Sequence, residues 1–175
     1  MGGAPAGILF AIGPTTPYSF VYRVRNELQR VSGKVPPLMP HPIRQVAAVA
    51  LRDGLVCLVT SRNRRRWVVP KGHVEPGQTP QETAVAEAWE EAGLRGTVDP
   101  DPLGLYHYKK RGRSHAVTVY RFNLIVEHEQ WPERMQRDRE WVPLDEAARR
   151  VHEMELRDLL LELSSESLVL EAVAG

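Results

Sequence analysis

Three acidic residues in the stretch PKGHVEPGQTPQETAVAEAWEEAGL (Pro70–Leu94) have the types and spacing of a metal site. Glu87, Glu90 and Glu91 stand at positions i, i+3 and i+4, so a helix brings their carboxylates to one face. Three negative charges this close repel one another unless a cation lies among them. Oxygen-only ligands favour Mg²⁺ first and Mn²⁺ second, and the lack of His and Cys in the cluster argues against zinc. We therefore predict a divalent-metal site here, with a merely solvated helix face as the alternative.

The residues around this cluster predict the helix that carries it. Thr79–Glu82 has the sequence of a capping box with Pro at the first helical position, and Gly93 stands where a left-handed C-terminal cap belongs. The helix should run from about Pro80 to Ala92. The loop before it contains Gly72, where the missing side chain lets the backbone come close to a ligand. We expect the Gly72 carbonyl to reach the same metal as the carboxylates.

Apolar and alternating stretches predict the rest of the fold. Asp53-Gly54 is a strong hairpin signal between two apolar runs, and Ser114–Glu127 alternates between two faces. Asp145 is expected to cap a short helix, and Cys57 to be a small core residue. Strands are expected at residues 43–52, 55–61, 67–69, 96–98, 103–110, 114–127 and 141–144, with further helices after 145 and from 155. This order predicts an α/β protein with a mixed sheet between helices.

Length and composition are those of a soluble domain. The 175 residues suit one domain; 42% of them are hydrophobic, 26% are charged, and the formal net charge is +1. The cations are clustered, with five in Arg62–Lys71 and four in Lys109–Arg113. The early apolar run Ile8–Ile12 is far shorter than the roughly 20 residues of a membrane span, so no membrane partner is expected. The single Cys57 cannot form an internal disulfide, which favours a cytoplasmic location.

The stretch from Gly72 to Leu94 resembles the Nudix hydrolase signature. That signature is Gly, five residues, Glu, seven residues, Arg-Glu, an apolar residue, any residue, Glu-Glu, any residue, Gly and an apolar residue. The matching positions are Gly72, Glu87, Ala88, Glu90, Glu91, Gly93 and Leu94. The resemblance implies an α/β/α sandwich, divalent cations held by the Glu residues, and hydrolysis of a nucleoside diphosphate linked to another moiety or of a related phosphoanhydride.

The resemblance divides the chain into two parts. It covers about residues 42–164, so we assign residues 42–175 to a Nudix hydrolase domain, and it leaves residues 1–41 unexplained. Because the first part is rich in Pro and has little periodicity, we interpret it as an irregular N-terminal extension. One short helix is expected there at Val24–Val31, and no function is assigned to the extension.

Two positions depart from the signature, because Gln78 stands in place of Glu and Ala86 in place of Arg. In the family these two charges are thought to brace the loop against the helix as an ion pair. Losing one charge would strand the other, which is costly, but here both are absent. Gln78 can still hydrogen-bond the loop, and the three Glu ligands remain. We predict an active enzyme with weaker metal affinity, and the alternative is a degenerate, non-catalytic domain that binds a ligand.

Outside the signature, the chain is most similar to the diphosphoinositol polyphosphate phosphohydrolases. The similar stretches are TSRNRRRWVVPKG, LGLYHYKKRGRSHAVTVYRFNLIV and WPERMQRDREWVPLDEA. In that branch basic residues contact the substrate phosphates; by position these are Arg44, Arg62 and Arg137, with Lys71, Arg111 and Arg113 as further candidates. Forked Arg donors suit a substrate with many phosphate charges. The resemblance implies a polyanionic phosphate substrate, although each Arg taken alone also fits a solvated surface charge.

Other partners are weighed against this one. Diadenosine polyphosphate hydrolases share the Pro-Lys-Gly-His loop and are the second substrate class. Adenine stacking would need an available aromatic ring; Tyr106, Tyr108 and Trp131 are the candidates, although each also fits core packing. Nucleic acid is not expected, because no aromatic residues are interleaved with the basic stretches. A homodimer is left open.

The expected mechanism is in-line attack on phosphorus by a metal-activated water. Glu90 is the first candidate for the general base and Glu87 the second. Three acids outside the signature could add a ligand or a base: Glu127, Glu129 and Glu140. His73 is expected to orient the loop. Covalent catalysis is not expected, because the chain lacks a Gly-x-Ser-x-Gly elbow and Cys57 has no nucleophile-like setting.

Overall fold

The computed structural model describes residues 41–174, with side chains as far as Glu166. All the elements named below belong to the compact unit that begins at His41. The helix predicted at Val24–Val31, with the rest of the extension up to Pro40, lies outside the described residues.

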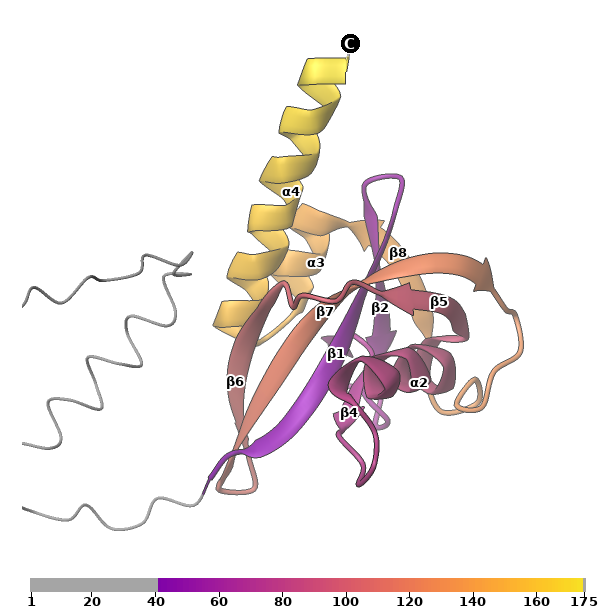
Figure 1. Cartoon of the computed structure of the whole chain (residues 1–175), viewed down its shortest axis with the longest axis vertical. Coiled ribbons are helices and arrows are strands. Elements are labelled where there is room, and N and C mark those ends of the chain that lie inside the picture. Colours follow the sequence, from indigo (N-terminus) through magenta and orange to yellow (C-terminus); the bar gives the residue numbers. More distant parts are fainter. Residues whose placement is uncertain (1–40, 175) are drawn as a thin grey trace, which may run out of the picture. The chain divides into compact units, whose positions relative to one another are not determined.

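Along the described chain the strands come in two groups, the first followed by one helix and the second by two (Figure 1). Their bounds are β1 (Ile43–Arg52), β2 (Leu55–Thr60), β3 (Trp67–Val68), β4 (Lys71–His73), α2 (Pro80–Ala92), β5 (Leu94–Val98), β6 (Gly104–Lys110), β7 (Arg113–Glu127), β8 (Arg139–Pro143), α3 (Leu144–Arg150) and α4 (Met154–Ala174). The predicted α/β class is confirmed.

The sheet is mixed because β1 pairs in both directions. In the middle of β1, Val46 lies opposite Thr118 of the parallel strand β7 and opposite Gly72 of the antiparallel strand β4. At its end β1 turns back into β2 through Asp53 and Gly54, whose φ angles of 51° and 74° are those of a tight hairpin turn. The main strand order is β3-β2-β1-β7-β5, with β4 on β1, β6 on β7 and β8 on β2.

Helices cover both faces of the sheet, which confirms the α/β/α sandwich (Figure 1). On one face α2 packs its small residues into the core through Ala84, Ala88 and Ala92. On the other face α3 and α4 pack through residues that include Ala147, Leu156 and Leu160. The alternation of β7 serves both cores, since Val117 and Val119 face α3 and α4 whereas Tyr120 and Phe122 face α2. Cys57 is fully buried on the α2 side, as expected.

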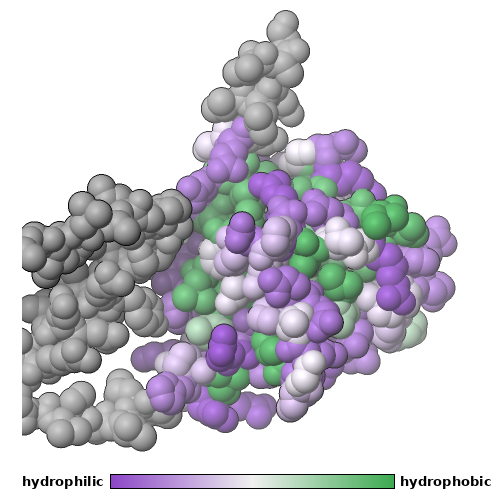
Figure 2. Space-filling view, viewed as in Figure 1, coloured by the Kyte–Doolittle hydropathy of each residue, from purple (hydrophilic) through white to green (hydrophobic). Residues whose placement is uncertain are grey.

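The face of the domain that Figure 2 shows is mixed in hydropathy. In Figure 2 hydrophobic residues appear in small groups between hydrophilic ones across the visible face. Among residues 41–174, no helix combines the length and the apolar character that crossing a membrane requires.

Two local predictions differ from the structure. Lys71–His73, predicted as part of a loop, forms the short strand β4, because its backbone pairs with β1. Three residues are too few for periodicity to reveal a strand. Asp145 does not cap α3, since Pro143 holds the N-cap position without a side-chain hydrogen bond. Asp145 lies in the first helical turn, where its carboxylate accepts a hydrogen bond from Arg149 at 2.9 Å.

Candidate active site

The helix α2 forms where the sequence predicts it. The Thr79 hydroxyl accepts from the Glu82 N–H at 3.2 Å, and the Glu82 carboxylate accepts from the Thr79 N–H at 2.8 Å, so the capping box is complete. At the other end Gly93 has a φ of 69°, a left-handed conformation that suits glycine. These two ends set the rotation of the helix and therefore the direction of its three predicted ligands.

The three carboxylates have different surroundings. Glu91 is 5% exposed; it accepts the Lys71 N–H at 3.1 Å and binds the guanidinium of Arg137. Glu87 is half-buried and lies so close to Gly72 that an added Cβ there would be 1.6 Å from a Glu87 oxygen. Glu90 is exposed. Burial, reinforced by the negative charges of Glu91 and Glu90, raises the pKa of Glu87 to about 7.

A pocket of about 260 Å³ lies between α2 and the opposing strands. Glu87, Glu91 and Gly72 line its acidic side. Its basic side is lined by Arg62, Arg66, Lys71, Lys110 and Arg137. Acidic and basic side chains therefore line one space, which could hold several phosphate groups and a cation.

The donor set fits a hard divalent ion in its chemistry, since it offers only carboxylate and carbonyl oxygens. The absence of a side chain at Gly72 also leaves the backbone open beside Glu87. As the side chains lie, however, no three Asp, Glu, His or Cys residues within 41–174 are close enough together to hold a metal. The cause is local, because Glu91 is turned toward Arg137 and Glu90 toward solvent.

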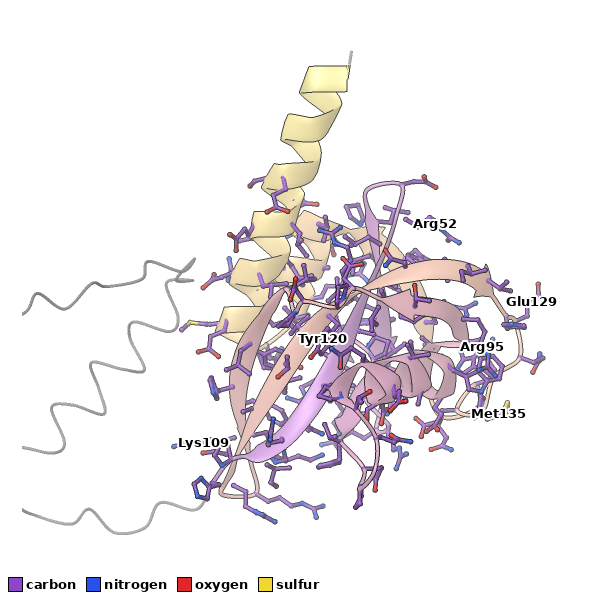
Figure 3. The ribbon with its side chains drawn as sticks, in the orientation of Figure 1. Arg52, Arg95, Lys109, Tyr120, Glu129 and Met135 are labelled. Carbon is purple, nitrogen blue, oxygen red and sulfur yellow. The ribbon has the colours of Figure 1, made fainter. Side chains whose placement is uncertain are left out.

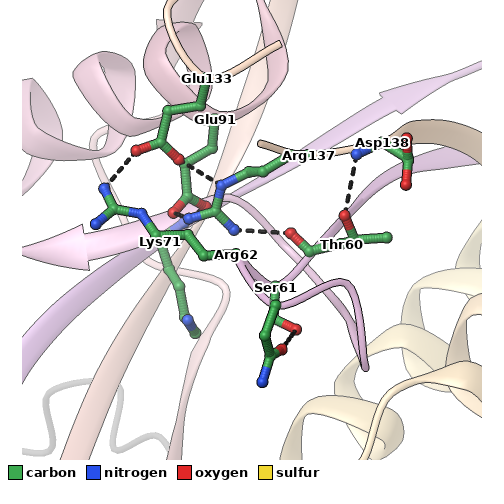
Figure 4. Close-up of polar contacts among 9 residues, drawn as sticks. Thr60, Ser61, Arg62, Lys71, Glu91, Glu133, Arg137 and Asp138 are labelled. Atoms are coloured by element: carbon green, nitrogen blue, oxygen red, sulfur yellow. Dashed lines mark hydrogen bonds and ion pairs between the residues drawn. The ribbon is translucent and has the colours of Figure 1, made fainter. Parts of the chain in front are cut away.

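Arg137 is the most enclosed cation of the site, with an exposed fraction of 5% (Figure 4). Its three guanidine nitrogens donate to three different groups. Nη2 binds Glu91, Nε binds Glu133, and Nη1 donates to the Thr60 carbonyl at 2.8 Å. Arg137 thus connects α2, the end of β2 and the segment that precedes β8. Its predicted contact with a substrate phosphate stays a prediction.

The other predicted cations divide into two groups. Arg62 and Lys71 line the pocket, and the Arg62 side chain is 71% exposed. Burial lowers the pKa of Lys71, and its ammonium lies 5.8 Å from the centre of the Tyr108 ring. The remaining three, Arg44, Arg111 and Arg113, are exposed and do not line the pocket. Two of these three flank the β6–β7 turn, close in sequence to the Lys109 labelled in Figure 3.

The other candidates are mostly engaged elsewhere. Tyr106 and Trp131 are buried, whereas Tyr108 lines the pocket and its hydroxyl donates to Gln45 at 2.6 Å. His73 is exposed and lines the pocket. The three further acids lie away from it: Glu127 pairs with Arg52 and Arg139, Glu140 pairs with Arg150, and Glu129 borders a separate cavity beside Trp131. Burial raises the pKa of the Cys57 thiol to about 12, so it stays protonated at neutral pH.

Three residues of the site were not among the predicted site residues. Arg66 and Lys110 line the pocket, and both belong to the cationic clusters visible in the sequence. Glu133 is buried and binds both Arg62 and Arg137. Its spacing of four residues from Arg137 is the signal that could have found it.

The profile of the NUDIX domain family matches residues 41–163 of the chain. The chain belongs to this family. The chain is 35% identical to Nudix hydrolase 4 of Arabidopsis thaliana over 139 residues. This match covers 74% of the chain and 66% of the relative. The chain is also 33% identical over 97 residues to human diphosphoinositol polyphosphate phosphohydrolase 3-beta, which covers 54% of the chain and 58% of the relative. The chain thus spans less than two thirds of the length of either relative.

Solved structures share the Nudix fold at lower identity. A MutT protein from Methanosarcina mazei Go1 superimposes with a TM-score of 0.61 at 22% identity, over 74% of this chain and 98% of that one. The Ap4A hydrolase of C. elegans superimposes with a TM-score of 0.58 at 22% identity, over 71% and 98% of the two chains. At this identity the similarity concerns the fold.

At the two positions that depart from the Nudix signature, a neutral hydrogen bond is present in place of an ion pair. The Gln78 side-chain oxygen accepts a hydrogen bond from the Thr83 hydroxyl at 3.1 Å, which connects the loop with the first turns of α2. Ala86 is half-buried on the same helix. The loop is therefore still joined to the helix, although by an amide and a hydroxyl rather than by two charges.

Proposed function

We propose that the chain is a Mg²⁺-dependent hydrolase of phosphoanhydride bonds, and that its substrates are diphosphoinositol polyphosphates. The observation that supports this most is the pocket itself, in which the acidic residues of α2 face five cationic side chains. A substrate with many phosphates needs both sides, because its charge must be offset by arginines and by a bound cation. The sequence similarity to a human protein named for this activity favours the same substrate class.

The metal would be held by Glu87, Glu90, Glu91 and the Gly72 carbonyl, with Mn²⁺ as a substitute for Mg²⁺. When bound, such an ion supplies charge neutralisation at the phosphate oxygens and acidifies a coordinated water. Of the two candidates for general base, Glu87 is now favoured over Glu90. Glu87 lines the pocket beside Gly72, whereas Glu90 does not line it.

The cations of the pocket would hold the substrate and stabilise the charge that spreads over the phosphate in the transition state. Arg62 is well placed to hold the substrate, because its side chain is exposed and lines the pocket. Lys71, the first residue of β4, is partly buried and lines the pocket, so it would also contribute to substrate binding. Arg137 binds the Glu91 carboxylate, so it offsets the negative charge of Glu91 and fixes its position.

A phosphate-release assay tests the proposal. Inositol pyrophosphates, diadenosine polyphosphates and nucleoside diphosphate sugars are compared at equal concentration, with Mg²⁺ and with a chelator. Inositol pyrophosphates should be turned over fastest, and both the chelator and Glu87→Gln should reduce release by about a hundredfold or more. Glu146→Gln, on α3, is the control for removal of a carboxylate. Tight binding without release would identify a non-catalytic Nudix domain instead.

Diadenosine polyphosphates are the second candidate. Tyr108 favours them, because it is the one residue of the three aromatic candidates that lines the pocket. Arg62→Ala separates the two substrates. It should lower turnover of the inositol pyrophosphate more than that of the dinucleotide, which carries fewer phosphate charges. The cytoplasmic location and a homodimer stay predictions, and two plant relatives are named as mitochondrial.

A further inference from the structure

Glu133 lies in the segment between β7 and β8, outside the Nudix signature, and it is 8% exposed. One of its carboxylate oxygens accepts from Nη2 of Arg62, and the other accepts from Nε of Arg137 (Figure 4). Its own N–H donates to the Glu90 carbonyl at 3.0 Å, which attaches this segment to the end of α2. A single carboxylate thus holds two arginines beside the pocket.

The four charged side chains form a line of alternating sign: Glu91, Arg137, Glu133 and Arg62. The first three are buried, and the last ends the line with an exposed cation. Arg137 is also anchored by the Thr60 carbonyl, so it does not depend on Glu91 alone for its position. The Asp138 N–H donates to the Thr60 hydroxyl at 3.0 Å and fastens the segment to the end of β2. The inner part of the line is therefore fixed to two elements of the sandwich.

Arg62 is different, because within residues 41–174 its guanidinium binds only the Glu133 side chain. An arginine in a charged loop has many rotamers, and fixing it against a phosphate costs conformational entropy. Glu133 removes part of that cost in advance, since it already holds one edge of the guanidinium. The remaining donors are left for an anion in the pocket.

We propose that Glu133 is a positioning residue for polyphosphate binding, which holds the Arg62 guanidinium at the pocket in the orientation that receives a substrate phosphate. This proposal rests on the proposed function, since it assigns a role within the same site. Glu133 does not touch the reacting atoms. Its loss should therefore weaken substrate binding more than it slows the chemical step.

The test is a double-mutant cycle on binding. The probe is the bis(methylene) analogue of inorganic triphosphate, whose carbon bridges resist hydrolysis. Its binding is measured by calorimetry in excess Mg²⁺. Glu133→Gln should weaken binding about tenfold, as expected for the loss of one pre-oriented side chain. Arg62→Ala should weaken it at least as much, and the double variant should bind no more than about twofold weaker than Arg62→Ala, because both changes remove the same contact. Glu133→Asp should restore part of the affinity.

Glu146→Gln is the matched control, since Glu146 also binds two arginines, Arg149 and Arg150, but on α3. It should bind the probe as the wild type does. In steady-state turnover Glu133→Gln should raise KM about tenfold and leave kcat within about twofold. Should Glu133→Gln fail to fold, Glu133→Asp and Arg62→Ala complete the same cycle.

Equal affinities of Glu133→Gln and the wild type would overturn the proposal, as would additive effects in the double variant or a wild type that does not bind the probe. The failure of the proposed function looks different. A wild type that binds the probe in the predicted pattern but hydrolyses no member of the substrate panel would refute the enzyme and leave the role of Glu133 in place.

Discussion

Two glutamates that each hold a pair of arginines show how differently the two faces of the sandwich use charge. Glu146, on α3, binds Arg149 and Arg150 at the surface, and a third of its side chain is exposed. Glu133, beside α2, binds Arg62 and Arg137 with 11% of its side chain exposed. Water can replace the ion pairs of Glu146 at little cost in free energy. It cannot reach most of the Glu133 carboxylate. The same kind of ion pairing therefore contributes little to stability on the α3 face, whereas on the α2 face it requires charges to be buried.

The cost is concentrated in one place. Among residues 41–166, the Asp, Glu, Lys and Arg residues whose whole-residue exposed fraction is 8% or less all belong to this cluster; these are Glu91, Glu133 and Arg137. Burying charge rarely adds stability over a well-packed apolar core. A fold that accepts it at one location, next to a pocket with a perturbed carboxylate, indicates that the charges are used there.

The largest expected effect comes from removing the central cation. Arg137→Met leaves Glu91 buried without a side-chain cation and leaves Glu133 with Arg62 alone, so the free energy of unfolding should fall by about 3–5 kcal/mol. Arg149→Met removes an arginine with equally many carboxylate contacts from the surface of α3 and should change stability far less. Denaturant unfolding of both variants measures the difference. Equal losses would mean that the two networks are equivalent after all.

A methyl group added on each face sharpens the comparison for activity. Gly72→Ala places a Cβ 1.6 Å from Glu87, and this should displace the carboxylate and lower kcat/KM by about a hundredfold. Gly104→Ala, on the face covered by α4, places a Cβ 2.7 Å from the end of the Leu159 side chain, and that side chain can move aside. It should lower the melting temperature slightly and keep the activity. If both variants kept wild-type turnover, the position of Glu87 beside Gly72 would be irrelevant to catalysis.

Metal binding should also distinguish the two faces. Raising Mg²⁺ to ten times its Kd should stabilise the wild type by about 1.4 kcal/mol, since a ligand of the native state shifts unfolding by mass action. Glu91→Gln should lose most of this gain, and Glu146→Gln should keep it. Thermal unfolding with Mg²⁺ and with a chelator measures the shift. A wild-type melting temperature that ignores Mg²⁺ would remove the basis for placing a metal on α2.

Local patterns were sufficient to predict the elements of the fold. The capping box at Thr79, the glycine at position 93 and the alternation of β7 each act within a few residues, and the structure has all three. β4 escaped prediction because its strand character comes from pairing with β1, which lies more than twenty residues earlier. The α/β/α class followed from the order of elements and from the resemblance to the Nudix signature.

Local spacing predicted only the acidic half of the site, whereas Arg62, Lys71 and Arg137 on its basic side came from the resemblance to a known branch of the family. The spacing of Glu87, Glu90 and Glu91 is local to one helix, so their common face could be deduced. The partner that each carboxylate takes is decided by segments far away in the sequence, as when Arg137 reaches Glu91 from beyond β7. Composition could show that Arg62 and Arg137 are both cations, but only packing shows that one is buried and the other is exposed.

The smallest expected effect concerns Gln78, where the chain departs from its family. Gln78→Ala removes the hydrogen bond to Thr83 and should lower the free energy of unfolding by about 0.5 kcal/mol, because the contact is only partly buried and Gln78 itself is exposed. Its effect on metal should be clearer, with Mg²⁺ affinity reduced a few fold, since the loop that joins Gly72 of β4 to α2 loses one of its attachments to the helix.

Gln81→Ala is the matched control for this change. Gln81 lies in the same first turns of α2. Its amide donates to the Pro100 carbonyl at 3.1 Å and not to the loop between β4 and α2. The two variants should lose similar stability, but only Gln78→Ala should weaken Mg²⁺ in a calorimetric titration. If both bound Mg²⁺ as the wild type does, the amide at position 78 would have no part in holding the loop, and the missing ion pair of the signature would have no replacement here.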